Sequence, residues 1–146
     1  MNEISSIKRI IIVGTRTFTD YEFLEIRVKS VINSIIKECG TDISFEFISG
    51  GANGADKVGE RFARRYNYST TIFNAEWDRF GKAAGIFRNS KMAEYASCES
   101  GYLIAFWDGE SRGTRQMIDV ALKYGLEVHV YNYASQKIHK ADTKGR

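Results

Sequence analysis

The sequence predicts a three-layer α/β domain, in which helices cover both faces of a five-stranded parallel sheet. Short apolar runs rich in β-branched residues alternate along the chain with longer segments whose apolar residues recur at helical spacing. Glycine and small polar residues mark the breaks between these segments, since the chain has no proline. The 146 residues, 43% hydrophobic and 27% charged, match the size and composition of one globular domain.

The first half of the chain predicts three strands and two helices. Residues 9–13 (RIIIV) form a continuous apolar run, as expected for a strand buried on both faces. Residues 20–38 carry apolar residues at helical spacing. Thr19 and Glu22 predict a capping box at the start of this helix, and Gly40 predicts its end. We expect the next elements to be a strand at 43–48, a helix at 55–67 and a strand at 70–73.

The second half predicts two further helices and two strands. A long connection at 74–85 precedes a helix at 87–96 and a strand at 102–107. The next helix, at 113–124, is expected to turn four apolar residues inward, namely Met117, Ile118, Ala121 and Leu122. A last strand is expected at 127–131. This alternation predicts one Rossmann-like domain over residues 1–136, followed by a basic, flexible tail at 137–146.

The formal net charge of +3 originates in the tail. Removing the four Lys or Arg and the one Asp of residues 137–146 from the totals of 21 basic and 18 acidic residues leaves a body of balanced charge. Nucleic-acid binding needs several phosphate contacts and is therefore disfavoured, although a local basic pocket is compatible with this balance.

The chain shows no sign of secretion, membrane insertion or metal binding. No segment approaches the length of an apolar span, and the N-terminus lacks the order of a signal peptide. Cys39 and Cys98 lie far apart, without the Cys or His spacing of a metal site. We therefore expect a cytoplasmic chain with two free, buried or half-buried thiols, no metal and no membrane partner. Homo-oligomer formation is left open.

Glycine, small hydroxyl residues and arginine gather where three of the predicted strands end. The loops are 14–17 (GTRT), 49–56 (SGGANGAD) and 108–115 (DGESRGTR). Ligands of open parallel sheets bind at the carboxyl ends of the strands, so we expect these loops to form one site. Glycines let backbone N–H groups approach an anion, and a helix N-terminus adds positive potential. The loops therefore predict a phosphate site, although glycines at strand–helix turns are also common in α/β folds.

Arg16, Arg112 and Arg115 are candidates for bidentate contacts to phosphate oxygens. The turn at 111–114 is expected to require Gly113, whose missing Cβ would permit a close approach of the backbone. The loops lack the Gly-Lys-Ser/Thr sequence of a P-loop and the GxGxxG spacing of a dinucleotide fold. ATP hydrolysis and hydride transfer are therefore disfavoured.

Aromatic and basic residues follow in the connection at 74–89. Trp77 and Phe80 are candidates for stacking on a base or ribose; the alternative is that Trp77 packs under a loop. The basic side chains there either meet phosphate or are solvated (Arg79, Lys82 and Arg88). Trp107 is a candidate pocket wall. The carboxylates considered for ribose hydroxyls or acid–base work are Asp56, Glu76, Asp78, Asp108 and Glu110. Asp56 is rather expected to stabilise its helix N-terminus. No Ser-His-Asp arrangement is recognisable.

These motifs resemble the YspA-type (cpYpsA-related) family of the SLOG superfamily, which is related to the lonely-guy phosphoribohydrolases and the Smf/DNA-processing protein A group. The resemblance covers nearly all of residues 8–131 and rests on VGTRTFTD (13–20), SGGANGAD (49–56), the stretch at 75–89 and AFWDGESRGTRQMID (105–119). The family usually has GSR where this chain has GTR at 14–16.

The resemblance implies a Rossmann-like fold and a pocket for a nucleotide or nucleotide-derived ligand, such as a nucleoside monophosphate or an ADP-ribose-like or NAD-derived signal, with no cofactor required. The ligand contacts that the loops and the resemblance together suggest are Gly14, Thr15, Arg16, Gly50, Gly51, Asn53, Gly54, Asp56, Trp77, Arg88, Asn89, Ser111, Arg112, Gly113 and Thr114.

One departure from the related hydrolases bears on catalysis. The lonely-guy enzymes carry a Gly-Thr-x-x-Glu motif with a catalytic glutamate, and this chain has Met117 at that place. A methionine cannot protonate a leaving base. We therefore expect a domain that binds or senses a phosphorylated, nucleotide-derived small molecule. The alternatives are a nucleotide-processing hydrolase of the N-glycosidase type, with Asp56, Asp108 or Glu110 as a substitute acid, and single-stranded nucleic-acid binding.

Overall fold

A computed structural model describes residues 6–135 of the chain. Five strands form one parallel sheet in the order β3-β2-β1-β4-β5. The strands are β1 (Ser6–Gly14), β2 (Ile43–Ser49), β3 (Ser69–Ile72), β4 (Ser100–Trp107) and β5 (Glu127–Asn132). This is the predicted α/β architecture with a five-stranded parallel sheet.

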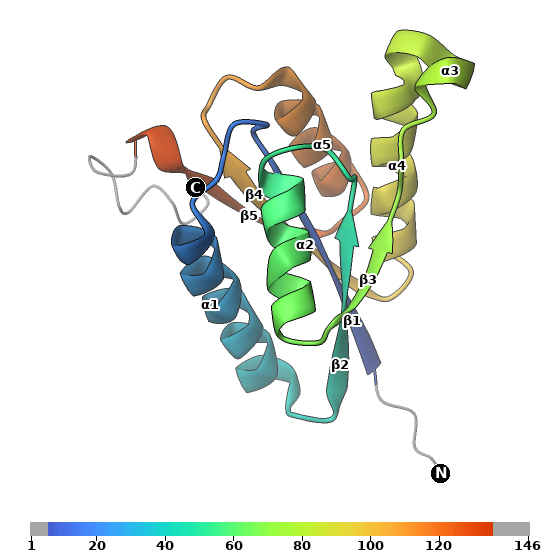
Figure 1. Cartoon of the computed structure of the whole chain (residues 1–146). Helices are drawn as coiled ribbons and strands as arrows, with labels where there is room; N and C mark the ends of the chain where they lie inside the picture. Colours follow the sequence, from blue (N-terminus) through green and yellow to red (C-terminus); the bar gives the residue numbers. More distant parts are fainter. Residues whose placement is uncertain (1–5, 136–146) are drawn as a thin grey trace.

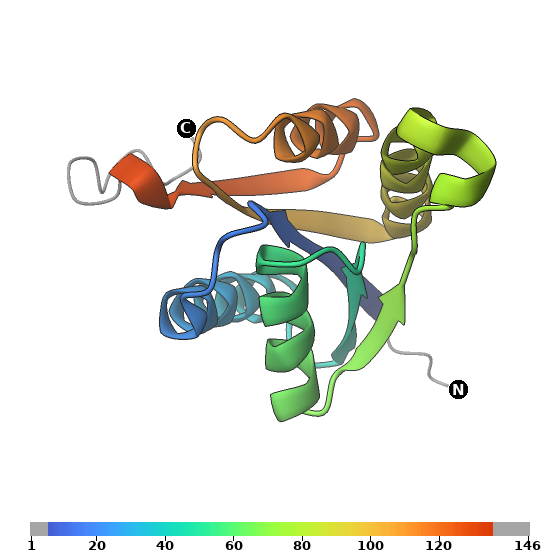
Figure 2. The same cartoon turned by 45° about the horizontal axis from the view of Figure 1, so that its top comes forward.

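Helices cover both faces of the sheet, as Figures 1 and 2 show. The helices are α1 (Tyr21–Cys39), α2 (Ala55–Arg65), the short α3 (Trp77–Phe80), α4 (Ala84–Ala96) and α5 (Arg112–Lys123). The chain runs outward from β1 to β3 and then returns to place β4 beside β1. Right-handed crossovers in these opposite directions put α1 and α2 on one face and α4 and α5 on the other. The three-layer, Rossmann-like prediction is confirmed.

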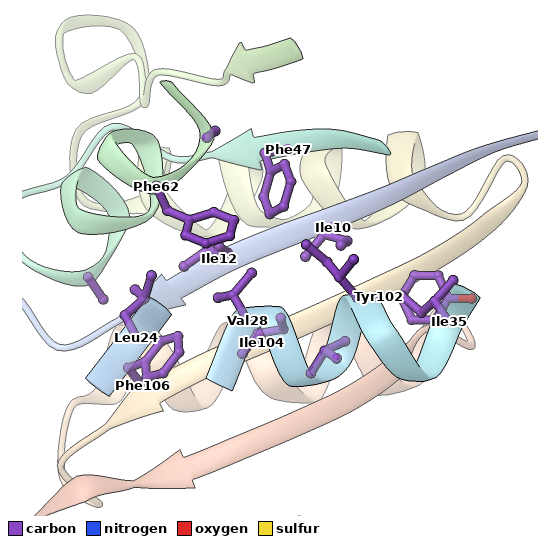
Figure 3. Packing of buried hydrophobic residues seen from close by; sticks show 14 of the residues in the cluster. Ile10, Ile12, Leu24, Val28, Ile35, Phe47, Phe62, Tyr102, Ile104 and Phe106 are labelled. Atoms are coloured by element: carbon purple, nitrogen blue, oxygen red, sulfur yellow. The ribbon is translucent and has the colours of Figure 1, made fainter. Parts of the chain in front are cut away.

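The core consists of two apolar layers separated by the sheet. Side chains of β1 alternate between them: Ile10 and Ile12 pack in the layer under α1 and α2, whereas Ile11 and Val13 pack in the layer under α4 and α5. Figure 3 shows the first layer, in which Phe62 of α2 lies near Ile12. Since β1 is buried on both faces, its run of apolar residues is continuous rather than alternating.

Three local predictions are wrong. Helix α1 is capped by Asp20, whose carboxylate accepts a hydrogen bond of 3.1 Å from the Phe23 N–H, so the capping box from Thr19 does not form. Leu122 is 58% exposed instead of facing inward. Cys39 and Cys98 are free, as predicted, but both are exposed.

The connection after β3 also contains more structure than predicted. It holds α3 and a 3-10 turn (Gly81–Ala83), and α4 begins three residues before the predicted start. Figure 1 shows α3 projecting at the N-terminal end of α4. The tail at 137–146 lies outside the described residues. Within residues 6–135, none of the helices has the length and apolar character needed to cross a membrane.

Candidate functional site

A cavity of about 370 Å³ opens at the carboxyl ends of the strands. Strand order reverses between β1 and β4, and Gly14, the last residue of β1, lines the cavity. The other walls come from the loop before α2 and its first turn, from α3 and the 3-10 turn after it, from α4, and from the first turns of α5. This is the upper edge of the sheet in Figure 1, above the arrowheads of β2 and β3. Such a reversal point is where open α/β sheets bind ligands.

A smaller cavity of about 220 Å³ adjoins the first. The two share four lining residues, Arg16, Ala52, Trp77 and Arg88. Backbone of the glycine loop and the side-chain amides of Asn53 and Asn74 line the smaller cavity. The two cavities therefore form one bilobed site with two arginines at the junction.

Gly54 brings the loop after β1 against the loop before α2. Its φ of +80° lies in the left-handed region, and a Cβ there would lie 2.3 Å from the Thr15 carbonyl oxygen. The neighbouring Ala55 N–H donates to that carbonyl at 3.2 Å. Gly54 lines neither cavity. Its missing Cβ lets the backbone of Thr15 and Arg16 pack against it, and this contact holds Arg16 at the cavity wall.

Thr15 is a positioning residue rather than a wall of the site. It is buried, its N–H donates to the Phe106 carbonyl at 3.0 Å, and its hydroxyl oxygen accepts from the Asp108 N–H at 3.0 Å. The hydroxyl thus ties the loop after β1 to the loop after β4. Threonine and serine both carry this oxygen, so the departure from GSR to GTR keeps the group.

The N-terminus of α5 faces the cavity. Ser111 caps the helix by accepting from the Thr114 N–H at 3.3 Å, while Arg112 and Gly113 line the cavity. The first N–H groups of a helix have no intrahelical partner, so this end is suited to an anion. The turn does not require glycine at Gly113, contrary to the prediction, because a Cβ there would meet nothing within 4 Å and its φ is not positive.

Asp108 and Glu110 lie outside both cavities. The Asp108 carboxylate accepts from the N–H groups of Glu110 and Ser111, at 2.8 Å and 2.9 Å, and these bonds hold the pKa of Asp108 below its usual value. Asp108 therefore shapes the loop before α5, and Glu110 is exposed. Of the carboxylates considered for ribose hydroxyls or acid–base chemistry, Asp56 lines the larger cavity, whereas Glu76, Asp78, Asp108 and Glu110 line neither.

Asp56 and Arg88 form the buried polar centre of the site. Asp56 is 5% exposed, and this burial raises the pKa of its carboxyl group to about 6, even though the group accepts from the Ala52 N–H at 3.2 Å and lies near Arg88. Arg88 donates to the Gly50 carbonyl at 2.7 Å. A Cβ on Gly50 would lie 2.7 Å from that guanidinium and 2.9 Å from an Asp56 carboxylate oxygen, so a larger residue there would displace one of the two side chains.

Positive charge dominates the larger cavity. Arg16, Lys82, Arg88 and Arg112 line it, against the single carboxylate of Asp56. Burial lowers the pKa of Arg88, and the nearby charge of Arg16 lowers it further. An anion between these two guanidinium groups would relieve their repulsion. Within residues 6–135, no group of three His, Cys, Asp or Glu side chains is placed to hold a metal ion.

The structure brings most of the predicted site residues together. Those that line the larger cavity are Gly14, Arg16, Asp56, Trp77, Arg88, Asn89, Ser111, Arg112, Gly113 and Thr114, and those that line only the smaller one are Gly50, Gly51 and Asn53. Four further candidates line neither cavity, namely Arg79, Phe80, Trp107 and Arg115. Of these, Arg79 pairs with Glu76 and Phe80 packs on Phe87.

Sequence reasoning missed the apolar and amide part of the wall. Ile86 and Met92 lie three residues before and after Asn89 on α4, so helical spacing from Asn89 would have indicated both. Gln116 and Met117 follow the predicted turn of α5 by two and three residues. Met117 is a core residue, as predicted, and also forms part of the cavity floor.

The raised pKa of Asp56 predicts a pH dependence of stability. Between pH 4 and pH 6 the folded chain binds more protons at this group than the unfolded chain, so its contribution to the free energy of unfolding falls as the pH rises. A shift from 3.8 to about 6 corresponds to about 3 kcal/mol in this window. Asp56→Asn should remove this component, as measured by urea unfolding at pH 4.5 and 7.5.

The exposed Asp119→Asn variant on α5 is the control and should keep the parent's pH dependence. Carboxylates whose pKa is lowered, such as Glu46, make the free energy of unfolding rise with pH, in the opposite direction to Asp56. Because both variants keep these carboxylates, a difference between their pH profiles comes from Asp56. Identical pH profiles for Asp56→Asn and the parent would show that Asp56 titrates normally in the folded chain.

Comparison with known proteins identifies the family of the chain. Residues 8–80, half of the chain, match the model of the family described as the YspA, cpYpsA-related SLOG family. The chain belongs to this family. The match to the SLOG family includes the loops after β1 and β2 and ends at α3, before the cavity-forming part of α4 and α5. Membership of the SLOG family suggests nucleotide-related ligand binding or processing.

The SLOG chain is also similar to the Gene 61 protein of Mycobacterium phage D29. The two are 28% identical over 127 residues, which cover 83% of this chain and 94% of the phage protein. No solved structure matches the SLOG chain.

Proposed function

We propose that this SLOG-family protein binds or senses a phosphorylated, nucleotide-derived small molecule in the bilobed site at the carboxyl edge of the sheet. The observation that carries the proposal is the four cations that line the larger cavity against one buried carboxylate. In a chain whose body has balanced charge, this local excess favours a small anion over a long polyanion.

The phosphate would lie at the junction of the two lobes. Arg16 and Arg88 line both cavities there, and Arg112 and Gly113 present the N-terminus of α5 to the larger one. Two guanidinium groups and a helix N-terminus together are a strong arrangement for phosphate oxygens. Arg88 is already held in place by its bond to the Gly50 carbonyl, so little side-chain entropy is lost on binding.

A nucleobase fits the apolar part of the larger cavity. Val13, Ile86, Met92 and Met117 line this part, and Trp77 at the junction is 52% exposed and offers a ring face for stacking. A volume of about 370 Å³ suits one nucleotide, since ligand pockets measure roughly 300–1,000 Å³. The smaller cavity leaves room for a second phosphate or a ribose, as in an ADP-ribose-like ligand.

The test is a thermal melt of the whole chain with AMP, IMP, ADP-ribose and cyclic NAD-derived nucleotides. A ligand at about 100 times its Kd adds about 2.7 kcal/mol to stability, which should raise the Tm by roughly 5–10 °C. Gly113→Val should abolish the shift, because it adds a bulky side chain at a residue that lines the larger cavity, and a Cβ there meets no atom within 4 Å, so α5 should be undisturbed. If no nucleotide raises the Tm of the parent, the proposal is wrong.

The control for Gly113→Val is Asp119→Val, which places the same side chain on an exposed position of α5 outside the cavity. It should bind as the parent does. Equal affinity for Gly113→Val and the parent would show that the ligand does not bind beside the N-terminus of α5.

Hydrolysis of the ligand is the second candidate, and the observation that favours it is Asp56. A buried carboxyl group with a pKa of about 6 in a cavity is suited to acid–base work near neutral pH. The samples of the binding test can be analysed for released base or ribose phosphate. We expect none; saturable multiple turnover that Asp56→Asn abolishes would favour the hydrolase instead.

The cytoplasm is the compartment that we propose for this function. Cys39 and Cys98 are exposed and free, which suits a reducing environment.

A further inference from the structure

A relay of hydrogen bonds crosses the floor of the larger cavity from α4 to α5. Arg88 donates through Nη1 to the Gly50 carbonyl at 2.7 Å and through Nε to Oδ1 of Asn89 at 2.9 Å. Asn89 donates through Nδ2 to Oε1 of Gln116 at 2.7 Å. Asn89 is 6% exposed, and Arg88, Asn89 and Gln116 all line the cavity.

Chemistry sets the direction of every bond in this relay. A guanidinium group can only donate, so Asn89 must turn its carbonyl oxygen toward Arg88. Its NH2 group must then point to Gln116, which receives it with its own carbonyl oxygen. Because the carbonyl oxygen of Gln116 is occupied by Asn89, the NH2 group is what this amide can offer to a ligand in the cavity.

We propose that Gln116 is a specificity-determining residue, whose NH2 group is held by this relay as a hydrogen-bond donor toward the base of the ligand. The inference rests on the proposed function and adds the chemistry that the base must offer, namely a carbonyl oxygen or an unprotonated ring nitrogen. The apolar residues around the relay argue for the base rather than the phosphate: Ile86 and Met92 flank Asn89 on α4, and Met117 follows Gln116 on α5.

The direction of the relay predicts what happens when one of its hydrogen bonds is reversed rather than removed. In Asn89→Asp, both oxygens of the carboxylate accept, one from Arg88 and the other from Gln116. Gln116 must then turn its NH2 group toward the new carboxylate and its carbonyl oxygen toward the cavity. The polarity that the ligand meets at Gln116 is reversed, although Gln116 itself is unchanged.

Binding of IMP and AMP measures this polarity. In IMP the oxygen at position 6 accepts and the N1–H donates. In AMP the amino group at position 6 donates and N1 accepts, so the two probes present opposite hydrogen-bonding edges. By calorimetry on the full chain, the parent should prefer one of the two by roughly tenfold, and Asn89→Asp should prefer the other. Gln116→Met should bind both about equally, whereas Arg115→Met, outside the cavity on the same helix, should keep the parent's preference.

A measurement without ligand checks the relay itself. Side-chain amide exchange with water, followed by NMR, should be slow for Asn89 and fast for Gln116 in the parent. In Asn89→Asp the exchange of the Gln116 NH2 group should slow by about tenfold, and the spectrum also reports whether the variant is folded. A protected Gln116 NH2 group in the parent would overturn the inference.

The outcomes separate the inference from the proposed function. If neither probe binds the parent but the amide exchange rates are as predicted, the proposed nucleotide binding is wrong, whereas the hydrogen-bond directions in the relay are confirmed. If both probes bind with a preference that Asn89→Asp and Gln116→Met leave unchanged, the specificity role of Gln116 is wrong and the proposed function stands.

Discussion

Replacing Arg88 by methionine should weaken binding of the proposed nucleotide-derived ligand by about 100-fold or more. Arg88 lies at the junction of both cavities, and its charge is partly desolvated there, so a phosphate that it contacts loses a strong charge-assisted hydrogen bond. Methionine retains much of the length and apolar body of the side chain. The loss should be measured by calorimetry with the nucleotide that gives the largest thermal shift.

The same substitution should lower the free energy of unfolding by about 1–3 kcal/mol. The buried Gly50 carbonyl loses its donor, and Asp56 loses the nearby positive charge that opposes the rise of its pKa. The double variant Arg88→Met/Asp56→Asn removes the buried charge as well. It should regain part of the stability at neutral pH without regaining affinity, which separates the two roles of Arg88.

Arg79→Met is the matched control for Arg88→Met. Arg79 lies in α3, just before α4, is exposed, and pairs with Glu76 at 3.5 Å outside both cavities. Its loss should change affinity and stability little, since exposed ion pairs contribute little. Equal effects of the two substitutions on affinity would mean that net charge, and not the position of Arg88, attracts the ligand.

Replacing Gly54 by alanine should destabilise the fold by about 3 kcal/mol or more. Two effects add: the positive-φ backbone conformation, with ψ of −131°, costs about 1–3 kcal/mol for a residue with a Cβ, and overpacking costs a further 1–3 kcal/mol. The new Cβ would meet the backbone of Thr15 and Arg16, neither of which can move as a side-chain end could. Urea unfolding of the variant measures the total loss.

Gly125→Ala isolates the first of these effects, the conformational cost. Gly125 also has a φ of +80°, but a Cβ there would meet nothing within 4 Å. It should therefore lose only the conformational part, about 1–2 kcal/mol. A similar loss for both variants would show that the loops after β1 and before α2 can separate to admit the Cβ, and that Gly54 does not hold Arg16 in place.

The sequence was sufficient to predict the architecture and the location of the site. The continuous apolar run around Ile11 can be buried on both faces only in the middle of a parallel sheet. Once the strands are parallel, their carboxyl ends lie at one edge, so the loops that follow β1, β2 and β4 were expected at that edge. These conclusions need only periodicity and connectivity, which are local properties of the chain. The strand order, which places β1 between β2 and β4, then makes these loops neighbours.

Burial and the direction of contacts were decided by the tertiary structure. Asp56 and Asp108 are the same residue type in similar glycine-rich loops, yet packing buries Asp56 in the cavity and leaves Asp108 to cap a turn. Leu122 follows Ala121 by a rotation of about 100° on α5, and only the placement of that helix on the sheet decides which of the two is buried.

The polar connections across the site are also tertiary. Thr15 bonds to Asp108 across 93 positions of sequence, and Asn89 bonds to Gln116 across 27. No local pattern marks such partners, because a hydroxyl or an amide takes its role from whichever group the fold places opposite it. The sequence alone therefore determined at which edge of the sheet the candidate site lies, whereas the packing of α4 against α5 decided which atoms line it.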